Sequence, residues 1–181
     1  TKATAFKVAE TSLQVNFVAG NVTGGVVPGW LISEYLGEKV ERTVPFVYIR
    51  ESRKAGGQKE LITGIAGNPE IRQGDSCLVV EELVNFSQTT CNSVALLRSL
   101  GYLATHAACI LFYNNPRSVE VLKEHCIEMV YLFTLSELLE TAEEEKTHPI
   151  ELIEQYREFL ADPLGWQAAR GLTRVEKGGT L

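Results

Sequence analysis

The chain has 181 residues, 45% hydrophobic and 22% charged, a composition typical of globular proteins and unlike that of disordered, collagenous or coiled-coil chains. Its 17 basic and 23 acidic residues give a net charge of −6, which argues against nucleic-acid binding through bulk positive charge. No apolar run reaches the roughly 20 residues of a membrane span, and the first residues lack the apolar stretch of a signal peptide. These features predict one cytoplasmic domain, residues 1–181, that binds neither nucleic acid nor membranes.

Short apolar runs alternate with segments of helical periodicity, which is the pattern of a parallel sheet with crossover helices. Strands are predicted for residues 15–19, 45–50, 76–81, 105–112 and 127–133, and residues 61–65 resume the same apolar pattern. Helices are predicted for residues 26–36, 87–100, 117–125, 134–145 and 149–160, with Gly37 and Gly101 as stops and a capping box of Thr134 and Glu137. The predicted fold class is α/β, a doubly wound, mostly parallel sheet flanked by helices. The C-terminal helical segment, residues 134–181, is expected to belong to the same domain.

The cysteines and histidines show no metal-binding or redox spacing. Cys77, Cys91, Cys109 and Cys126 are widely separated, and no two of them form a C-x-x-C pair. We therefore expect reduced, buried thiols and no directly protein-bound metal.

In a doubly wound sheet, ligands bind beyond the carboxyl ends of the strands, so the loops that follow strands are the places to look for a site. The first such loop, residues 20–25, reads Gly-Asn-Val-Thr-Gly-Gly and leads into a predicted helix. A turn of this kind can present backbone N–H groups to an anion at the helix N-terminus. The alternative is that its glycines only allow strand and helix to pack closely, because their spacing matches neither a dinucleotide-binding fingerprint nor a P-loop.

The second loop, residues 51–60, is polar and follows a strand that ends at Arg50. It carries Arg53, Lys54 and Lys59, a run of cations in an otherwise acidic chain. Such cations can close over a polyphosphate and neutralise charge that develops on it. The alternative is a solvated hairpin tip, because charge runs usually mark exposed surface.

The third loop begins with Glu81 and Glu82, at the end of the clearest central strand. Paired carboxylates at a strand end can accept hydrogen bonds from sugar hydroxyls or hold a hydrated divalent cation. The Asn, Ser, Gln and Thr side chains that follow can bond a phosphate at the N-terminus of the next helix. The alternative for Ser87 is a purely structural role as the N-cap of that helix.

Taken in this order, the three loops resemble the type I phosphoribosyltransferases, and most closely the orotate phosphoribosyltransferases. The resemblance runs from about residue 15 to the C-terminus. FVAGNVTGGVVP is similar to the family's pyrophosphate loop, and PFVYIRESRKAGGQKELITG to a strand, mobile hood loop and returning strand. CLVVEELVNFSQTTCNSVALLRSLG is similar to its phosphoribosyl-diphosphate motif and following helix, and YREFLADPLGW to its terminal helix.

The resemblance implies a role for each loop. Lys54 falls where the mobile loop supplies a catalytic lysine. The implied pyrophosphate-binding residues are Arg50, Arg53, Lys59, Thr23, Gly24 and Gly25; the ribose-binding residues are Glu81 and Glu82; and the 5′-phosphate-binding residues are Asn85, Phe86, Ser87, Gln88 and Thr89. The implied reaction joins orotate to C1 of phosphoribosyl diphosphate with loss of pyrophosphate. Mg²⁺ would arrive with the diphosphate, and the mobile loop would close over the neighbouring subunit's site in a homodimer.

Several positions depart from the family pattern. Glutamates stand at 81 and 82 where the family has aspartates or a mixed pair, and residues 85–88 replace a turn rich in threonine and glycine. Glu51 replaces a frequent lysine and Gly56 a common histidine. The sequence is therefore compatible with two functions. One is phosphoribosyl transfer to a pyrimidine base by an altered site. The other is a catalytically inactive relative that binds a nucleotide or phosphorylated sugar in a regulatory role.

Overall fold

The computed structural model describes residues 1–11, 13–50 and 61–174. Within these residues, seven strands form one sheet. The strands are β1 (Phe17–Asn21), β2 (Phe46–Ile49), β3 (Ile62–Thr63), β4 (Ser76–Val80), β5 (Leu83–Val84), β6 (Leu103–Phe112) and β7 (Glu128–Thr134). Their order is β3-β2-β1-β4-β6-β5, and β7 pairs with β6. All of these pairings are parallel except that of β2 with β3, so the mostly parallel sheet predicted from the sequence is confirmed.

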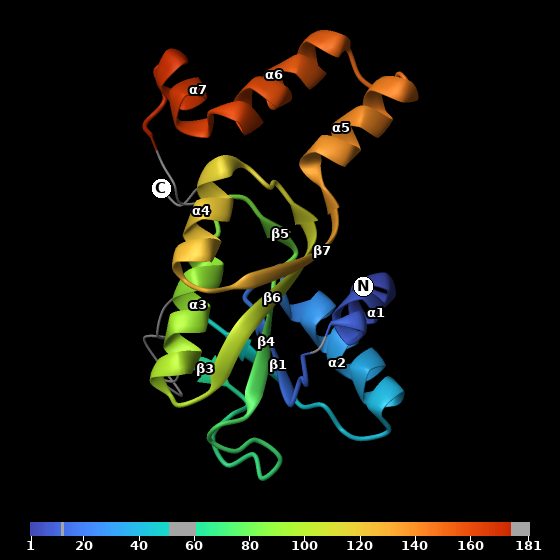
Figure 1. Ribbon diagram of the computed structural model, residues 1–181, viewed down its shortest axis with the longest axis vertical. Helices are drawn as coiled ribbons and strands as arrows, with labels where there is room; N and C mark the ends of the chain where they lie inside the picture. The colour runs from blue at the N-terminus through green and yellow to red at the C-terminus, as the bar shows by residue number, and fades with distance from the viewer. Residues whose placement is uncertain (12, 51–60, 175–181) are drawn as a thin grey trace.

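Helices cover both faces of the sheet. The helices are α1 (Lys2–Glu10), α2 (Val26–Val40), α3 (Gln88–Ser99), α4 (Pro116–Glu124), α5 (Leu135–Glu144), α6 (Ile150–Ala161) and α7 (Pro163–Ala169). Figure 1 shows α1 and α2 on one side of the sheet and α3 and α4 on the other. The layered arrangement is that of a doubly wound fold.

The central strands are buried on both faces, which explains why they are continuously apolar rather than alternating. In β4, Cys77 and Val79 pack into the core under α3 and α4, whereas Leu78 and Val80 pack into the core under α1 and α2. All four side chains are 0% exposed. The period of two along the strand thus divides one apolar run between two cores.

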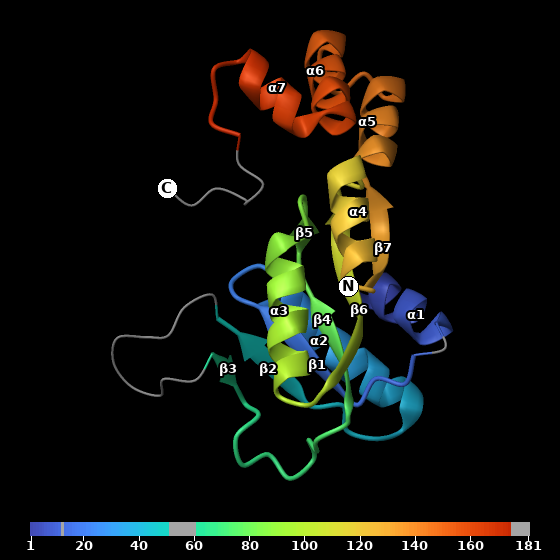
Figure 2. The same ribbon diagram turned by 60° about the vertical axis from the view of Figure 1, so that its left-hand side comes forward.

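The last three helices lie beyond the carboxyl ends of β6 and β7, as Figures 1 and 2 both show. The predicted capping box is present at the start of α5: the Thr134 hydroxyl accepts from the Glu137 backbone N–H, and the Glu137 carboxylate accepts from that of Thr134. A small apolar core of Leu135, Leu139 and Ile153 joins α5 to α6. No described helix is both long and apolar enough to traverse a bilayer.

Some predicted boundaries are wrong and some elements were missed. Gly37 does not end its helix: α2 continues to Val40 and ends at Glu41, which has a left-handed φ of 51°. A glycine inside a helix costs only about 1 kcal/mol, so the apolar contacts of the helix outweigh it. No strong periodicity in the sequence predicts α1, β5 or α7. For α7 a signal existed, because the Asp162 side chain caps the helix and Pro163 follows at its first position.

The prediction of buried thiols holds for three of the four cysteines. All four are free, and Cys126 is exposed at the turn after α4, so the prediction is wrong for that residue. Burial raises the pKa of the Cys91 thiol to about 11. It raises that of Cys109 to about 12, with a smaller contribution from the Glu81 carboxylate. These two thiols therefore stay protonated and unreactive near neutral pH.

Candidate functional site

The described residues that follow β1, β2 and β4 lie at the same carboxyl edge of the sheet. Asn21 at the end of β1 is in register with Ile49 at the end of β2, and the Val22 backbone N–H donates to the Ile49 carbonyl at 2.9 Å. On the other side of β1, Gly20 is in register with Val80 of β4. The strand order therefore places residues 21–25, Arg50 and the Glu81–Glu82 pair side by side, as sequence reasoning expected.

The loop that follows β1 turns tightly into α2. The Gly25 backbone N–H donates to the Asn21 carbonyl at 2.8 Å, and that of Gly29 to the Gly25 carbonyl at 2.9 Å. Thr23 is exposed and Gly24 is half-buried, whereas Gly25 is buried. Of the three residues predicted to bind pyrophosphate here, Thr23 and Gly24 are thus accessible to a ligand, and Gly25 lies beneath them.

Glu81 is joined directly to this loop. The Asn21 side-chain amide donates to Oε1 of Glu81 at 2.5 Å. The amide oxygen of Asn21 accepts from the hydroxyl of Ser93, on α3, at 2.7 Å. Asn21 and Ser93 are both buried, so this chain of hydrogen bonds links β1, β4 and α3 in a low-dielectric setting.

Glu82 is exposed and lies against Gly24. A Cβ atom added to Gly24 would come within 3.0 Å of the Glu82 Cβ and 2.6 Å of its Oε2. A carboxylate therefore lies next to the loop predicted to bind pyrophosphate. Its negative charge opposes an anion at that position.

The predicted 5′-phosphate segment turns most of its side chains into the protein. The Asn115 amide donates to the Asn85 carbonyl at 2.9 Å and to its side-chain oxygen at 3.1 Å. Phe86 is 4% exposed and packs edge-on against Phe159 of α6, with ring centroids 6.4 Å apart. In contrast, Gln88 is half-buried and Thr89 is exposed at the start of α3.

The Ser87 side chain is engaged within the protein. It occupies the N-cap position of α3 but makes no side-chain cap hydrogen bond, and its hydroxyl instead pairs with that of Ser118. Its φ is 63°, in the left-handed region that glycine adopts without strain. Within residues 86–88, the left-handed backbone conformation that glycine favours therefore occurs at Ser87 and not at Phe86 or Gln88.

The buried position of Phe86 predicts a stability effect. Phe86→Leu should lower the free energy of unfolding by about 1 kcal/mol, because leucine retains most of the buried area but loses the aromatic pairing with Phe159. Chemical denaturation measures the change. Phe6→Leu is the matched control, because Phe6 is 49% exposed and should tolerate the same substitution with little effect. Equal losses for the two variants would contradict the packing of Phe86 against α6.

Arg50 lies at the end of β2 with its guanidinium over the Tyr48 ring, 5.2 Å from the centroid. Its Nη2 donates to the Tyr48 hydroxyl at 2.9 Å. Its Nε–H is buried and has no hydrogen-bond partner in the described part of the chain. An unpaired donor of this kind is costly and favours an anionic ligand nearby. The predicted site residues Arg53, Lys54 and Lys59 lie outside the described residues.

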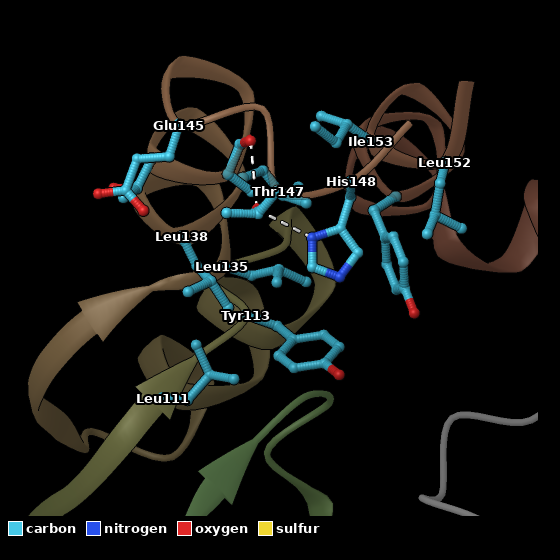
Figure 3. Close-up of a pocket in the computed structure, with 13 residues that line it drawn as sticks. Leu111, Tyr113, Leu135, Leu138, Glu145, Thr147, His148, Leu152 and Ile153 are labelled. Atoms are coloured by element: carbon cyan, nitrogen blue, oxygen red, sulfur yellow. Dashed lines mark hydrogen bonds between the residues drawn. The ribbon is translucent and has the colours of Figure 1, made fainter. Parts of the chain in front are cut away.

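A separate apolar groove of about 420 Å³ lies between α5, α6 and the end of β6. Figure 3 shows Leu111, Leu135 and Tyr113 among the residues that line it. The His148 side chain, from the turn before α6, points toward Tyr113. None of the predicted site residues that the structure describes lines it. The groove and the loops after β1 and β4 are therefore distinct surfaces of the molecule.

Sequence reasoning missed three residues that organise the site, namely Asn21, Ser93 and Asn115. A polar residue at the end of a buried strand was a usable signal for Asn21. Asn115 and Ser93 carried no comparable signal, because their partners are remote in sequence. Among the described residues, no cluster of three or more His, Cys, Asp or Glu side chains could hold a metal ion.

The strand order and the helices on both faces of the sheet resemble the fold of the type I phosphoribosyltransferases. Solved structures share the fold. Orotate phosphoribosyltransferase from Aeropyrum pernix has a TM-score of 0.59 at 22% identity, over 77% of this chain and 73% of that one. That of Mycobacterium tuberculosis in complex with 5-phospho-alpha-D-ribosyl 1-diphosphate has a TM-score of 0.57 at 16% identity, over 75% of each chain.

In sequence, the chain is similar to orotate phosphoribosyltransferases. It is 27% identical over 157 residues to that of Ruegeria sp., covering 86% of this chain and 65% of the relative. It is 28% identical over 163 residues to that of Phocaeicola vulgatus, covering 90% of this chain and 72% of the relative. The chain thus spans about two thirds of the length of these curated relatives. No family model matches it.

Proposed function

We propose that this protein binds 5-phosphoribosyl 1-diphosphate at the carboxyl edge of its sheet and transfers the phosphoribosyl group to orotate. The observation that carries the proposal is the hydrogen bond of 2.5 Å between Asn21 and Glu81. It joins the proposed pyrophosphate loop to the proposed ribose-binding acid, as one ligand spanning both requires. The similarity to orotate phosphoribosyltransferases supplies the identity of the acceptor.

In this proposal each part of the ligand meets a matching group. The carboxylates of Glu81 and Glu82 accept hydrogen bonds from the ribose hydroxyls. Backbone N–H groups at the start of α3, with Gln88 and Thr89, bind the 5′-phosphate at a helix N-terminus. The side chains of Asn85, Phe86 and Ser87 face inward and hold this segment in place. Thr23, Gly24 and the unpaired donor of Arg50 face the diphosphate.

The proposed reaction forms a bond between a ring nitrogen of orotate and C1 of the ribose. The bond from C1 to the diphosphate oxygen breaks, and pyrophosphate leaves with the electron pair. Positive charge develops at C1 and negative charge on the leaving group, so cations over the diphosphate lower the barrier. We assign that role to Lys54, assisted by Arg53 and Lys59. Mg²⁺ would neutralise the diphosphate with which it binds, and a homodimer would bring each loop over its neighbour's site.

The proposal is tested by two measurements on the wild-type protein. Calorimetric titration with phosphoribosyl diphosphate and Mg²⁺ should show saturable binding. Adding orotate should then release pyrophosphate at a rate that depends on both substrates. Binding without orotate-dependent release would exclude the transferase activity, and the absence of binding would exclude the proposed ligand.

A second candidate function is a non-catalytic binding role for a nucleotide or phosphorylated sugar. The contact of the Glu82 side chain with Gly24 favours it, because a carboxylate there opposes the binding of pyrophosphate. Such a protein would bind a monophosphate, such as ribose 5-phosphate, more tightly than it binds the diphosphate. The two candidates therefore differ in the order of these two affinities.

The charge of Glu82 predicts opposite changes for two ligands. Glu82→Gln should tighten pyrophosphate binding by about threefold, because an exposed charge at this range contributes well under 1 kcal/mol per unit of ligand charge. The same variant should weaken ribose 5-phosphate binding, because an amide is a poorer acceptor for hydroxyls than a carboxylate. Glu140→Gln on α5 is the matched control and should change neither affinity. Tighter binding of both ligands would contradict the ribose role.

A further inference from the structure

The side chain of Asn21 lies between two elements of the site and has both ends of its amide engaged. Its Oδ1 accepts from Ser93 at 2.7 Å, and its Nδ2 donates to Oε1 of Glu81 at 2.5 Å. The residue is 3% exposed, and Ser93 is 5% exposed. Because an ionised carboxylate only accepts hydrogen bonds, Glu81 takes the Nδ2 end of the amide, and the Ser93 hydroxyl donates to the Oδ1 end.

This arrangement constrains the flexible side chain of Glu81. Glu81 is half-buried, and a glutamate has one more rotatable bond than an aspartate. Holding a flexible side chain in one rotamer costs conformational entropy, which a preformed hydrogen bond meets before the ligand arrives. With Oε1 directed at Asn21, this oxygen of the carboxylate has a fixed position relative to the sheet.

The main chain of Asn21 adds a second link. Its carbonyl accepts from the Gly25 N–H at 2.8 Å and so closes the turn that contains Thr23 and Gly24. One residue therefore sets both the position of the Glu81 carboxylate, through its side chain, and the shape of the neighbouring loop, through its backbone. Substituting the side chain leaves the backbone link in place.

We propose that Asn21 is a positioning residue that orients the Glu81 carboxylate toward a hydroxyl of a bound 5-phosphorylated ribose, with Ser93 holding the Asn21 amide in place through a second hydrogen bond. The inference rests on the proposed function and adds to it the source of sugar recognition. Asn21 does not touch the ligand and acts through Glu81. Its contribution is confined to the sugar and does not extend to the phosphate, which the start of α3 binds.

The test compares ribose 5-phosphate with inorganic phosphate, because the dissociation constant of phosphate divided by that of ribose 5-phosphate isolates the contribution of the sugar. Asn21→Ala should reduce this ratio by about tenfold, the value of one hydrogen bond to a charged group, with phosphate affinity unchanged. Ser93→Ala should reduce it by about two- to threefold, since the amide keeps its hydrogen bond to Glu81 but loses the second one that holds it in place. Asn68→Ala, in the exposed turn before β4, is the control and should leave the ratio unchanged.

The outcomes separate this inference from the proposed function. A wild-type protein that binds ribose 5-phosphate no better than phosphate would overturn both. A wild-type preference for the sugar that survives in Asn21→Ala would overturn the positioning role alone. Equal weakening of both ligands would also overturn it, because that is the result of a general structural defect. Thermal unfolding identifies a variant that fails to fold, and the milder Ser93→Ala then carries the test.

Discussion

Lys54→Ala is expected to lower orotate-dependent pyrophosphate release by about 10²- to 10³-fold, the usual effect of removing one group that stabilises transition-state charge. The reduction should appear in kcat more than in KM. The reason is that the diphosphate gains charge only as its bond to C1 breaks, so the ammonium group contributes more to the transition state than to the bound substrate. A continuous pyrophosphate assay at saturating orotate measures it.

Lys123→Ala is the matched control for Lys54→Ala. It removes the same charge from an exposed position at the end of α4 and should leave turnover unchanged. Turnover that is equal in the two variants would exclude Lys54 from the catalytic role. A rise in KM alone, with kcat preserved, would instead assign Lys54 to substrate binding.

The central sheet could be predicted from the sequence because its strands are buried on both faces. A run such as Cys77 to Val80 must be continuously apolar in that setting, and no amphipathic helix has such a pattern. The capping box at Thr134 was also predictable, since both of its partners lie within one helical turn. Features that depend on neighbours in sequence were therefore recovered.

Side-chain direction within the site could not be predicted in the same way. The residues of the proposed phosphate segment face inward because their partners, Asn115 and Phe159, come from α4 and α6, which follow much later in the chain. In the sequence, Phe86 and Gln88 stand within the segment where the phosphoribosyltransferases that the chain resembles have a turn rich in threonine and glycine. The structure places the Phe86 ring in an aromatic contact away from the loop, so truncating it would remove core packing rather than clear the site.

For the acidic pair, Glu81 and Glu82, the sequence predicted the position but not the difference between the two residues. Its position after β4 was predicted from the apolar strand before it. The division of roles within the pair was not, because both residues are glutamates of identical chemistry. In the structure Glu81 is tied to Asn21, whereas Glu82 is exposed and lies on Gly24. Their different surroundings come from the two neighbouring strands and lead us to expect different effects on ligand binding.

The packing of the first loop against β4 predicts the largest stability effect. Gly25→Ala should lower the free energy of unfolding by about 4 kcal/mol, a severe loss against a typical total of about 5–15 kcal/mol. The added Cβ would lie 2.1 Å from the Val80 carbonyl oxygen and 2.7 Å from the Asn21 backbone nitrogen. Both are main-chain atoms held in paired strands, so neither can rotate away as a side chain would. Urea denaturation measures the loss.

The loss of stability in Gly25→Ala is expected to come from a steric clash. A substitution at a second glycine, Gly67, shows the effect of backbone strain alone. Gly25 has a φ of −76°, which alanine adopts freely. Gly67 has the opposite combination, open space around its Cα and a left-handed φ of 72°. Gly67→Ala should therefore cost only about 1–2 kcal/mol.

Because relief of the clash at Gly25 moves the loop away from β4, Gly25→Ala should also lose ribose 5-phosphate binding, whereas Gly67→Ala should retain it. A Gly25→Ala protein as stable as Gly67→Ala would contradict the seating of this loop against the end of β4.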